Sequence, residues 1–185
     1  MPAITEVTIR RARREDVGVI VAMLADDPLG GGRERIEDPL PQCYFTAFET
    51  VDRDPNIQLV VAEDGEGAVV GCLQLCILPG LSSQGASRGL IEDVRVASRC
   101  RSRGIGEQMV QWAVVEARAR GCRLVELLTH HTRVDAQRFY QRLGFARSHV
   151  GMTLRFLSLW CFRAKHVLGL DPGAKSGSRQ EDASE

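Results

Sequence analysis

The chain has 185 residues, of which 44% are hydrophobic and 26% charged, and this balance predicts a folded domain with a substantial core. Basic and acidic residues number 24 each, so the formal net charge is zero and no global field favours nucleic acid or an anionic membrane. The first residues hold no apolar signal core, and no segment approaches the length of a membrane span. We therefore expect a cytoplasmic protein that has neither a nucleic-acid nor a membrane partner.

The six cysteines are scattered and show no paired spacing typical of a disulfide framework or a zinc site. Cys72 and Cys76 fall on one face of an expected strand, where small buried thiols are a better interpretation than a metal pair. The sequence thus predicts reduced thiols and no bound metal.

The first third of the chain predicts a strand, two helices and a hairpin. Residues 7–11 alternate like a strand, and Asp16 is expected to cap a helix that follows it. A stretch rich in glycine and proline then leads to a second helix from about Pro41 to Val51. This stretch is either a connector or a lid over a substrate. Residues 57–63 and 68–78 are strand-like runs joined by a turn, which indicates a hairpin.

The segment 88–120 is the one around which the rest is organised. Ile91, Val94 and Val96 indicate a strand, three arginines follow between residues 99 and 103, and Gly104 with Gly106 opens an amphipathic helix. Glycines let the backbone approach an anion, and the free N–H groups and dipole of a helix start attract it. This pattern predicts a seat for a pyrophosphate.

After this helix the chain predicts a strand, a loop, a short helix and two closing strands. The strand covers 124–129, the helix runs over 135–143 and ends at Gly144, and the closing strands cover 145–147 and 152–157. Strands that alternate with helices between hairpins indicate a mixed α/β sheet. A Rossmann domain is excluded because the glycine pattern is R-x-x-G-x-G and few βαβ units surround it.

Residues 1–157 are therefore expected to form one domain, and residues 158–185 a carboxy-terminal extension. The extension begins with an apolar segment, 159–169, and ends in a tail of small and charged residues that should be disordered. Packing of the apolar segment on its own domain is favoured. The alternatives are that this segment packs on a second copy of the chain, which would give a homodimer, or on a membrane surface.

Two motifs resemble those of the GCN5-related N-acetyltransferase (GNAT) superfamily. Residues 101–106, RSRGIG, match Q/R-x-x-G-x-G/A, and residues 136–145, AQRFYQRLGF, match A-x-x-x-Y-x-x-x-G-F. Residues 53–56, 133–140 and 148–149 add a closer likeness to bacterial aminoalkylphosphonate N-acetyltransferases. The resemblance implies an α/β GNAT fold with a mixed, mostly antiparallel sheet of six to seven strands flanked by about four helices.

The resemblance also implies an enzyme that moves an acetyl group from acetyl-CoA to the primary amine of a small molecule. The strand backbone would hold the pantetheine chain and the turn would hold the pyrophosphate. Carried over residue by residue, the implied cofactor-binding residues are Val94, Arg95, Val96, Arg101, Ser102, Arg103, Gly104, Ile105, Gly106, Glu107, Arg133, Ala136 and Phe139. Arg99, Arg101 or Arg103 would add side-chain charge at the pyrophosphate. Arg99 and Arg103 are equally well interpreted as solvated charges.

Tyr140 and Glu92 are the implied catalytic residues. A phenol keeps its proton at neutral pH, so Tyr140 suits the acid that protonates the departing thiolate. Glu92 shares strand parity with Val94 and Val96 and is expected to face the cleft as the base, with Asp93 on the other face. Some relatives carry an acidic residue two positions earlier, where this chain has Leu90. His130 and His131 are therefore alternatives to Glu92 as the base.

The acceptor amine stays open between several classes. Arg133 stands where many relatives have asparagine, and it suits a CoA phosphate or an anionic acceptor such as an aminoalkylphosphonate. An antibiotic, a polyamine or a protein amino terminus is an alternative acceptor. A catalytically idle module that binds acyl-CoA and regulates a partner is the alternative outside enzymes.

Overall fold

The computed structural model describes residues 6–27 and 31–154 of the chain. It divides into two units, 1–150 and 151–185, and every helix and strand described here belongs to the first. The expected apolar segment 159–169 and the tail beyond it lie outside the described residues. No described helix is long and apolar enough to cross a membrane.

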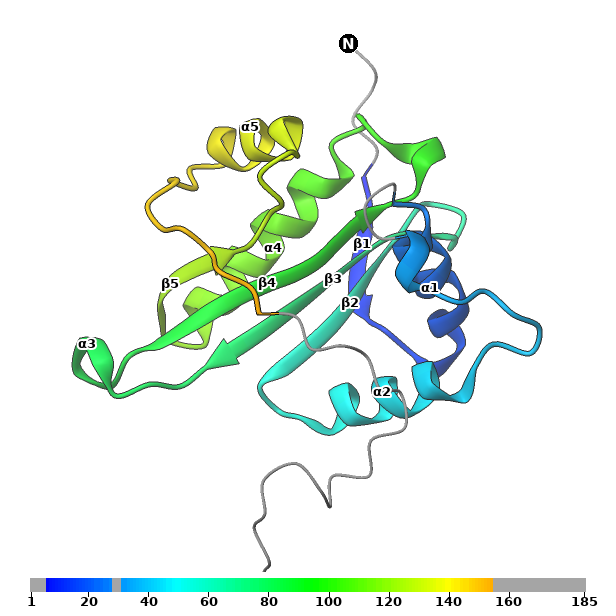
Figure 1. Cartoon of the computed structure of the whole chain (residues 1–185), viewed down its shortest axis with the longest axis horizontal. Helices are drawn as coiled ribbons and strands as arrows, with labels where there is room; N and C mark the ends of the chain where they lie inside the picture. The colour runs from blue at the N-terminus through cyan, green and yellow to red at the C-terminus, as the bar shows by residue number, and fades with distance from the viewer. Residues whose placement is uncertain (1–5, 28–30, 155–185) are drawn as a thin grey trace, which may run out of the picture. The chain divides into compact units, whose positions relative to one another are not determined.

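Five strands and five helices make up the described part of the first unit (Figure 1). In chain order they are β1 Thr8–Arg11, α1 Val17–Ala25, α2 Gln42–Arg53, β2 Ile57–Glu63, β3 Val69–Leu78, α3 Ser82–Gly85, β4 Ser87–Val96, α4 Ile105–Ala119, β5 Cys122–Leu127 and α5 Val134–Arg142. Helix α3 is a single turn, in which Ser83 and Gln84 have left-handed backbone angles. The expected elements up to residue 143 are therefore confirmed, with boundaries that move by a few residues.

The five strands form one sheet in the order β1-β2-β3-β4-β5. The first three pairs are antiparallel, and β4 and β5 are parallel because α4 carries the chain back across the sheet between them. The register of β3 on β4 slips between Cys72 and Gln74, and Asp93 on β4 has a φ of 48°. Gln74 lies opposite Glu92 while Cys72 lies opposite Arg95, so β4 carries one extra residue, a β-bulge.

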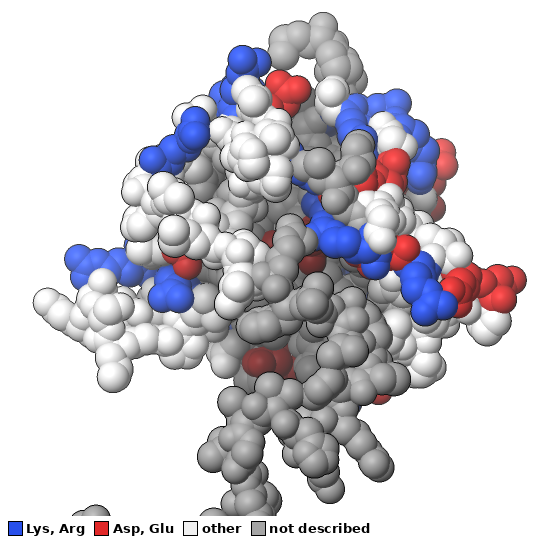
Figure 2. Space-filling view, viewed as in Figure 1, with Lys and Arg blue, Asp and Glu red and all other residues white. Residues whose placement is uncertain are grey.

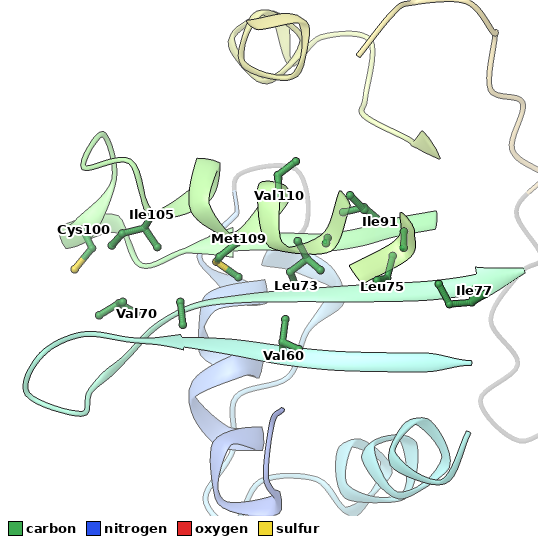
Figure 3. Close-up of a cluster of buried hydrophobic side chains, with 13 residues drawn as sticks. Val60, Val70, Leu73, Leu75, Ile77, Ile91, Cys100, Ile105, Met109 and Val110 are labelled. Carbon is green, nitrogen blue, oxygen red and sulfur yellow. The ribbon is translucent and has the colours of Figure 1, made fainter. Parts of the chain in front are cut away.

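The two faces of the sheet bury different clusters. Helix α4 covers one face, where Leu73, Leu75 and Ile91 pack under Met109 and Val110 (Figure 3). On the other face, Ile20 and Met23 of α1 pack against Val61 and Cys72. Alternate residues of β2 and β3 serve the two clusters, as expected for a sheet with helices on both sides. Cys72 and Cys76 are buried free thiols, and burial raises the pKa of the Cys72 thiol to about 12.

Two expectations about the carboxy-terminal strands and one about a cap are wrong. Residues 145–147 and 152–154 form no strand, so the described sheet has five strands rather than six or seven, and residues 155–157 lie outside the described part. The carboxylate of Asp16 does not cap α1. It accepts instead from the backbone N–H of Arg13 at 2.6 Å and from the guanidinium of Arg10 at 2.7 Å, which draws it back toward β1.

Candidate active site

Strands β4 and β5 separate halfway along β4, and this opening defines the candidate site. Their parallel pairing ends at Ile91 opposite Leu127, yet β4 continues to Val96. Over the described residues, the backbone of Val94–Val96 therefore has no neighbouring strand on its β5 side. A free strand edge can accept the amides of an extended ligand as if the ligand were an added strand.

The bulge at Asp93 decides which side chains face which side of β4. Val94 and Val96 pack with the cluster under α4, whereas Glu92 lies on the opposite face with Gln74 and Cys76. The Gln74 amide donates to Glu92 at 3.3 Å, and the Glu92 side chain is exposed. The expected shared parity of Glu92 with Val94 and Val96 is therefore wrong, because an extra residue interrupts the alternation.

The glycine turn forms the start of α4 next to the open edge. Gly104 has a φ of 79°, a left-handed conformation that side chains disfavour, and the helix begins at the following residue. The free N–H groups of this first turn carry the positive end of the helix dipole. Ile105 is 2% exposed and belongs to the cluster under α4. Glu107 is exposed and accepts from Gln111 at 3.1 Å.

The arginines of the turn differ in their surroundings. Arg101 donates to the Asp26 carboxylate at 3.0 Å and to the Val96 carbonyl at 3.2 Å, which fixes the turn to the end of α1. Ser102 and Arg103 are exposed. The side chain of Arg101 therefore holds the turn in place.

Helix α5 brings Tyr140 to the open region. The Tyr140 ring makes edge contacts with Phe139, at 5.0 Å between centroids, and with Phe145, at 5.9 Å. Phe139 packs beside Gly106 and Val96, where a Cβ on Gly106 would lie 3.6 Å from both side chains. Ala136 lies one turn before Tyr140 and is partly buried. Phe139 therefore packs α5 on the start of α4.

The Tyr140 phenol sits in an environment that keeps it protonated. Burial raises the pKa of this phenol, and the positive charges of Arg95 and Arg133 lower it by less, so the pKa stays above its ordinary value. A phenol of this kind is neutral at pH 7 and can donate its proton.

A charged cluster that the sequence did not reveal joins three elements at this site. Asp27, just after α1, is 6% exposed and accepts from Arg95 of β4 at 3.3 Å and from Arg133, which precedes α5. Arg95 also donates to the Val94 carbonyl at 3.0 Å. The only sequence signal for this cluster was the pair Asp26-Asp27 after an apolar helix. Because Pro-Leu-Gly follows, the pair is typical of an ordinary turn.

His130 and His131 lie on the loop between β5 and α5. Their rings stack with centroids 4.4 Å apart, and His130 pairs with the Thr132 hydroxyl at 2.8 Å. Both are exposed loop residues, and no described contact links them to Glu92 or Tyr140. On the face shown in Figure 2, basic and acidic side chains are interspersed, in keeping with the zero formal net charge.

A strand pair that opens beside a glycine-led helix start can hold an extended ligand that carries both amides and an anionic group. The model of the acetyltransferase (GNAT) family matches residues 11–145. The chain belongs to this family.

Two individual relatives are similar to most of the chain, and a third is similar to about a third of it. The aminoalkylphosphonate N-acetyltransferase of Salmonella typhimurium is 32% identical over 146 residues, which cover 78% of this chain and 88% of that protein. The crystal structure of a transcriptional regulator from Bacillus halodurans is 48% identical, covers 82% of this chain and 100% of that one, and has a TM-score of 0.79. Glucosamine 6-phosphate N-acetyltransferase 1 of Oryza sativa is 38% identical over 68 residues, 37% of this chain and 39% of that protein.

Proposed function

We propose that the protein transfers the acetyl group of acetyl-CoA to the primary amine of a small molecule, with an aminoalkylphosphonate as the leading acceptor. The observation that carries this proposal is the free edge of Val94–Val96 directly beside the start of α4 at Gly104. An edge for amides next to a seat for an anion suits a cofactor that contains both a pantetheine chain and a pyrophosphate.

Acetyl-CoA would lie between β4 and the first turn of α4. The backbone of Val94, Arg95 and Val96 would pair with the pantetheine amides, and the N–H groups of residues 101–107 would hold the pyrophosphate. Arg103, exposed at the turn, adds a charge that can meet a phosphate, whereas Arg101 is engaged by Asp26. Ala136 and Phe139 shape the α5 side of this path.

The proposed chemistry uses one base and one acid. Glu92 removes a proton from the acceptor ammonium, directly or through a water, and the neutral nitrogen attacks the thioester carbonyl. The resulting tetrahedral intermediate collapses, the C–S bond breaks, and Tyr140 gives its proton to the departing thiolate. As the intermediate collapses, the nitrogen loses its second proton to the Tyr140 phenolate, directly or through a water, and Glu92 releases its proton to solvent. The products are an N-acetylated amine and free CoA.

The acceptor proposal is supported by the names of the two curated relatives. One acts on an aminoalkylphosphonate and the other on glucosamine 6-phosphate, so each name combines an amine with a phosphorus oxyanion. Other amines, such as an antibiotic, a polyamine or a protein amino terminus, would use the same chemistry and are the alternatives within this reaction.

A regulatory module that binds acyl-CoA without turnover is the second candidate function. The 48% identical protein from Bacillus halodurans, a transcriptional regulator, is the observation that favours it. The purified full chain should be given acetyl-CoA and a panel of amines while thiol release is followed. Thiol release matched by an N-acetylated product supports the enzyme, and acetyl-CoA binding without thiol release with any amine supports the module.

A further inference from the structure

The bulge on β4 places a carboxylate and a guanidinium on one face of the candidate site. In a regular strand, Glu92 and Arg95 would point to opposite faces, because three positions separate them. The extra residue at Asp93 brings both side chains to the same face, because Glu92 lies opposite Gln74 and Arg95 lies opposite Cys72. These partners are two residues apart on β3, a rise of about 7 Å.

Arg95 and Arg133 form a positively charged pair around one buried carboxylate. Both guanidinium groups donate to Asp27, whose side chain is 4% exposed, so two positive charges meet one negative charge. Among the described residues, Asp93 also pairs with Arg95, at 3.9 Å, but it is 55% exposed, so water screens this pair. The two guanidinium groups therefore carry one more positive charge than their shared buried counter-ion.

Both arginines keep donors to spare within the described residues. All the described hydrogen bonds of the Arg133 side chain run through Nη2 to Asp27, and this side chain is 33% exposed. The Nε of Arg95 is buried without a hydrogen-bond partner among the described residues. A buried donor without a partner costs free energy that an oxyanion could recover.

We propose that Arg95 and Arg133, held in place by Asp27, bind the oxyanion of the acceptor, a phosphonate or phosphate group, while Glu92 on the same face receives its amine. This inference rests on the proposed function and adds to it the part of the site that selects the acceptor. Asp27 is a positioning residue in this arrangement, because it acts through the two arginines.

The dimensions of the site suit a short acceptor. A molecule that contacts both Glu92 and Arg95 gains about 3 Å of reach from each hydrogen bond, so a linker of a few atoms bridges the two. The subsite also lies beside the proposed acid. Burial is the largest influence on Tyr140 and raises its pKa, and both arginines are close enough to lower that pKa in part.

Matched acceptors test this subsite directly. The full chain should be assayed for thiol release with 2-aminoethylphosphonate, with its diethyl ester, and with ethanolamine; the last two lack the oxyanion. We expect Arg133→Gln to raise the KM for the phosphonate roughly 10- to 100-fold and to leave the KM for the two amines without an oxyanion within about 3-fold. Arg133→Lys should recover part of the loss. The control is Arg138→Gln on α5, whose side chain is 69% exposed and, among the described residues, pairs with Asp135 at 3.6 Å.

Three results would overturn the proposal or separate its failure from that of the enzyme. An equal rise of KM for amines with and without the oxyanion in Arg133→Gln overturns the subsite, as does a wild-type enzyme that acetylates amines without preferring the phosphonate. If no amine is acetylated, the proposed function fails, and the subsite is then tested by binding of 2-aminoethylphosphonate alone. A melting temperature raised by 2-aminoethylphosphonate in the wild type but not in Arg133→Gln then supports it, and no rise in the wild type overturns it.

Discussion

Glu92 and Arg95 lie on the same face of β4 although three positions separate them, because the bulge at Asp93 inserts an extra residue between their partners on β3. The same bulge turns Val94 and Val96 toward the cluster under α4. One backbone irregularity thus divides β4 into a part where Glu92 lies with Gln74 and Cys76, and an edge that we propose holds the cofactor.

Replacement of Tyr140 by phenylalanine should slow turnover about 100-fold, because the thiolate would leave without a positioned acid. The KM for acetyl-CoA should change by less than about 3-fold, since the ring contacts with Phe139 and Phe145 remain. Steady-state kinetics measure both quantities. Tyr44→Phe on α2 is the matched control, and an unchanged turnover number in Tyr140→Phe would remove the phenol from the mechanism.

Replacement of Glu92 by glutamine should remove the acidic limb of the pH-rate profile and lower kcat/KM about 100-fold. The amide cannot take a proton from the acceptor, although it can still accept the hydrogen bond from Gln74. Glu126→Gln on β5 is the control, because Glu126 is a half-exposed acid that pairs with Arg88 at 2.9 Å. A variant at position 92 that keeps its acidic limb would show that another group is the base.

Asp27→Asn should destabilise the fold by about 3 kcal/mol, since it leaves two arginine side chains without their shared buried counter-ion. Its neighbour Asp26 offers a matched comparison. Asp26→Asn breaks the pair with Arg101, in which both side chains are 52% exposed, and should cost less than about 1 kcal/mol. Urea unfolding followed by circular dichroism compares the two, and equal losses would contradict the assigned difference in burial.

Asp16→Asn should reveal a pH-dependent contribution to stability. Burial raises the pKa of this carboxyl, but the hydrogen bonds from Arg10 and from the Arg13 N–H outweigh it, so the pKa lies below the ordinary value of an aspartate. A lowered folded-state pKa adds stability that is fully present above about pH 4 and disappears as the pH falls through the folded-state pKa.

The free energy of unfolding of Asp16→Asn should therefore be below that of the wild type at pH 7, and the gap should narrow below about pH 4. Urea titrations at a series of pH values measure this gap. Glu15→Gln, an exposed acid in the same turn, should show almost no gap at any pH. A gap for Asp16→Asn that stayed constant down to pH 2 would contradict the role of its charge.

Local patterns predicted most elements but not the contacts between them. The glycine turn and the strand before it were predictable, because Gly104 and Gly106 have a specific backbone role and Val94 and Val96 are β-branched. The bulge at Asp93 was not, because nothing in a single sequence distinguishes an aspartate within a strand from one that forms a bulge. The parity argument for Glu92 failed for this reason.

Charge pairs between residues far apart in the chain could not be predicted from the sequence for a related reason. Asp27 and Arg133 are 106 positions apart, so their pairing depends on how α1, β4 and α5 meet rather than on any local spacing. Asp16 illustrates the same limit at shorter range, since Arg10 competes with the cap position for its carboxylate. Arg133 was expected from the resemblance alone, and its engagement by Asp27 was visible only in the structure.

Thiol release from acetyl-CoA with 2-aminoethylphosphonate as acceptor tests the central claim most directly. The wild-type chain should release one thiol for each N-acetylated product identified by mass spectrometry, and Tyr140→Phe should bind acetyl-CoA as well as the wild type while releasing thiol about 100-fold more slowly. Binding of acetyl-CoA without thiol release, with this amine and with every other amine of the panel, would contradict the claim that the protein is an acetyltransferase.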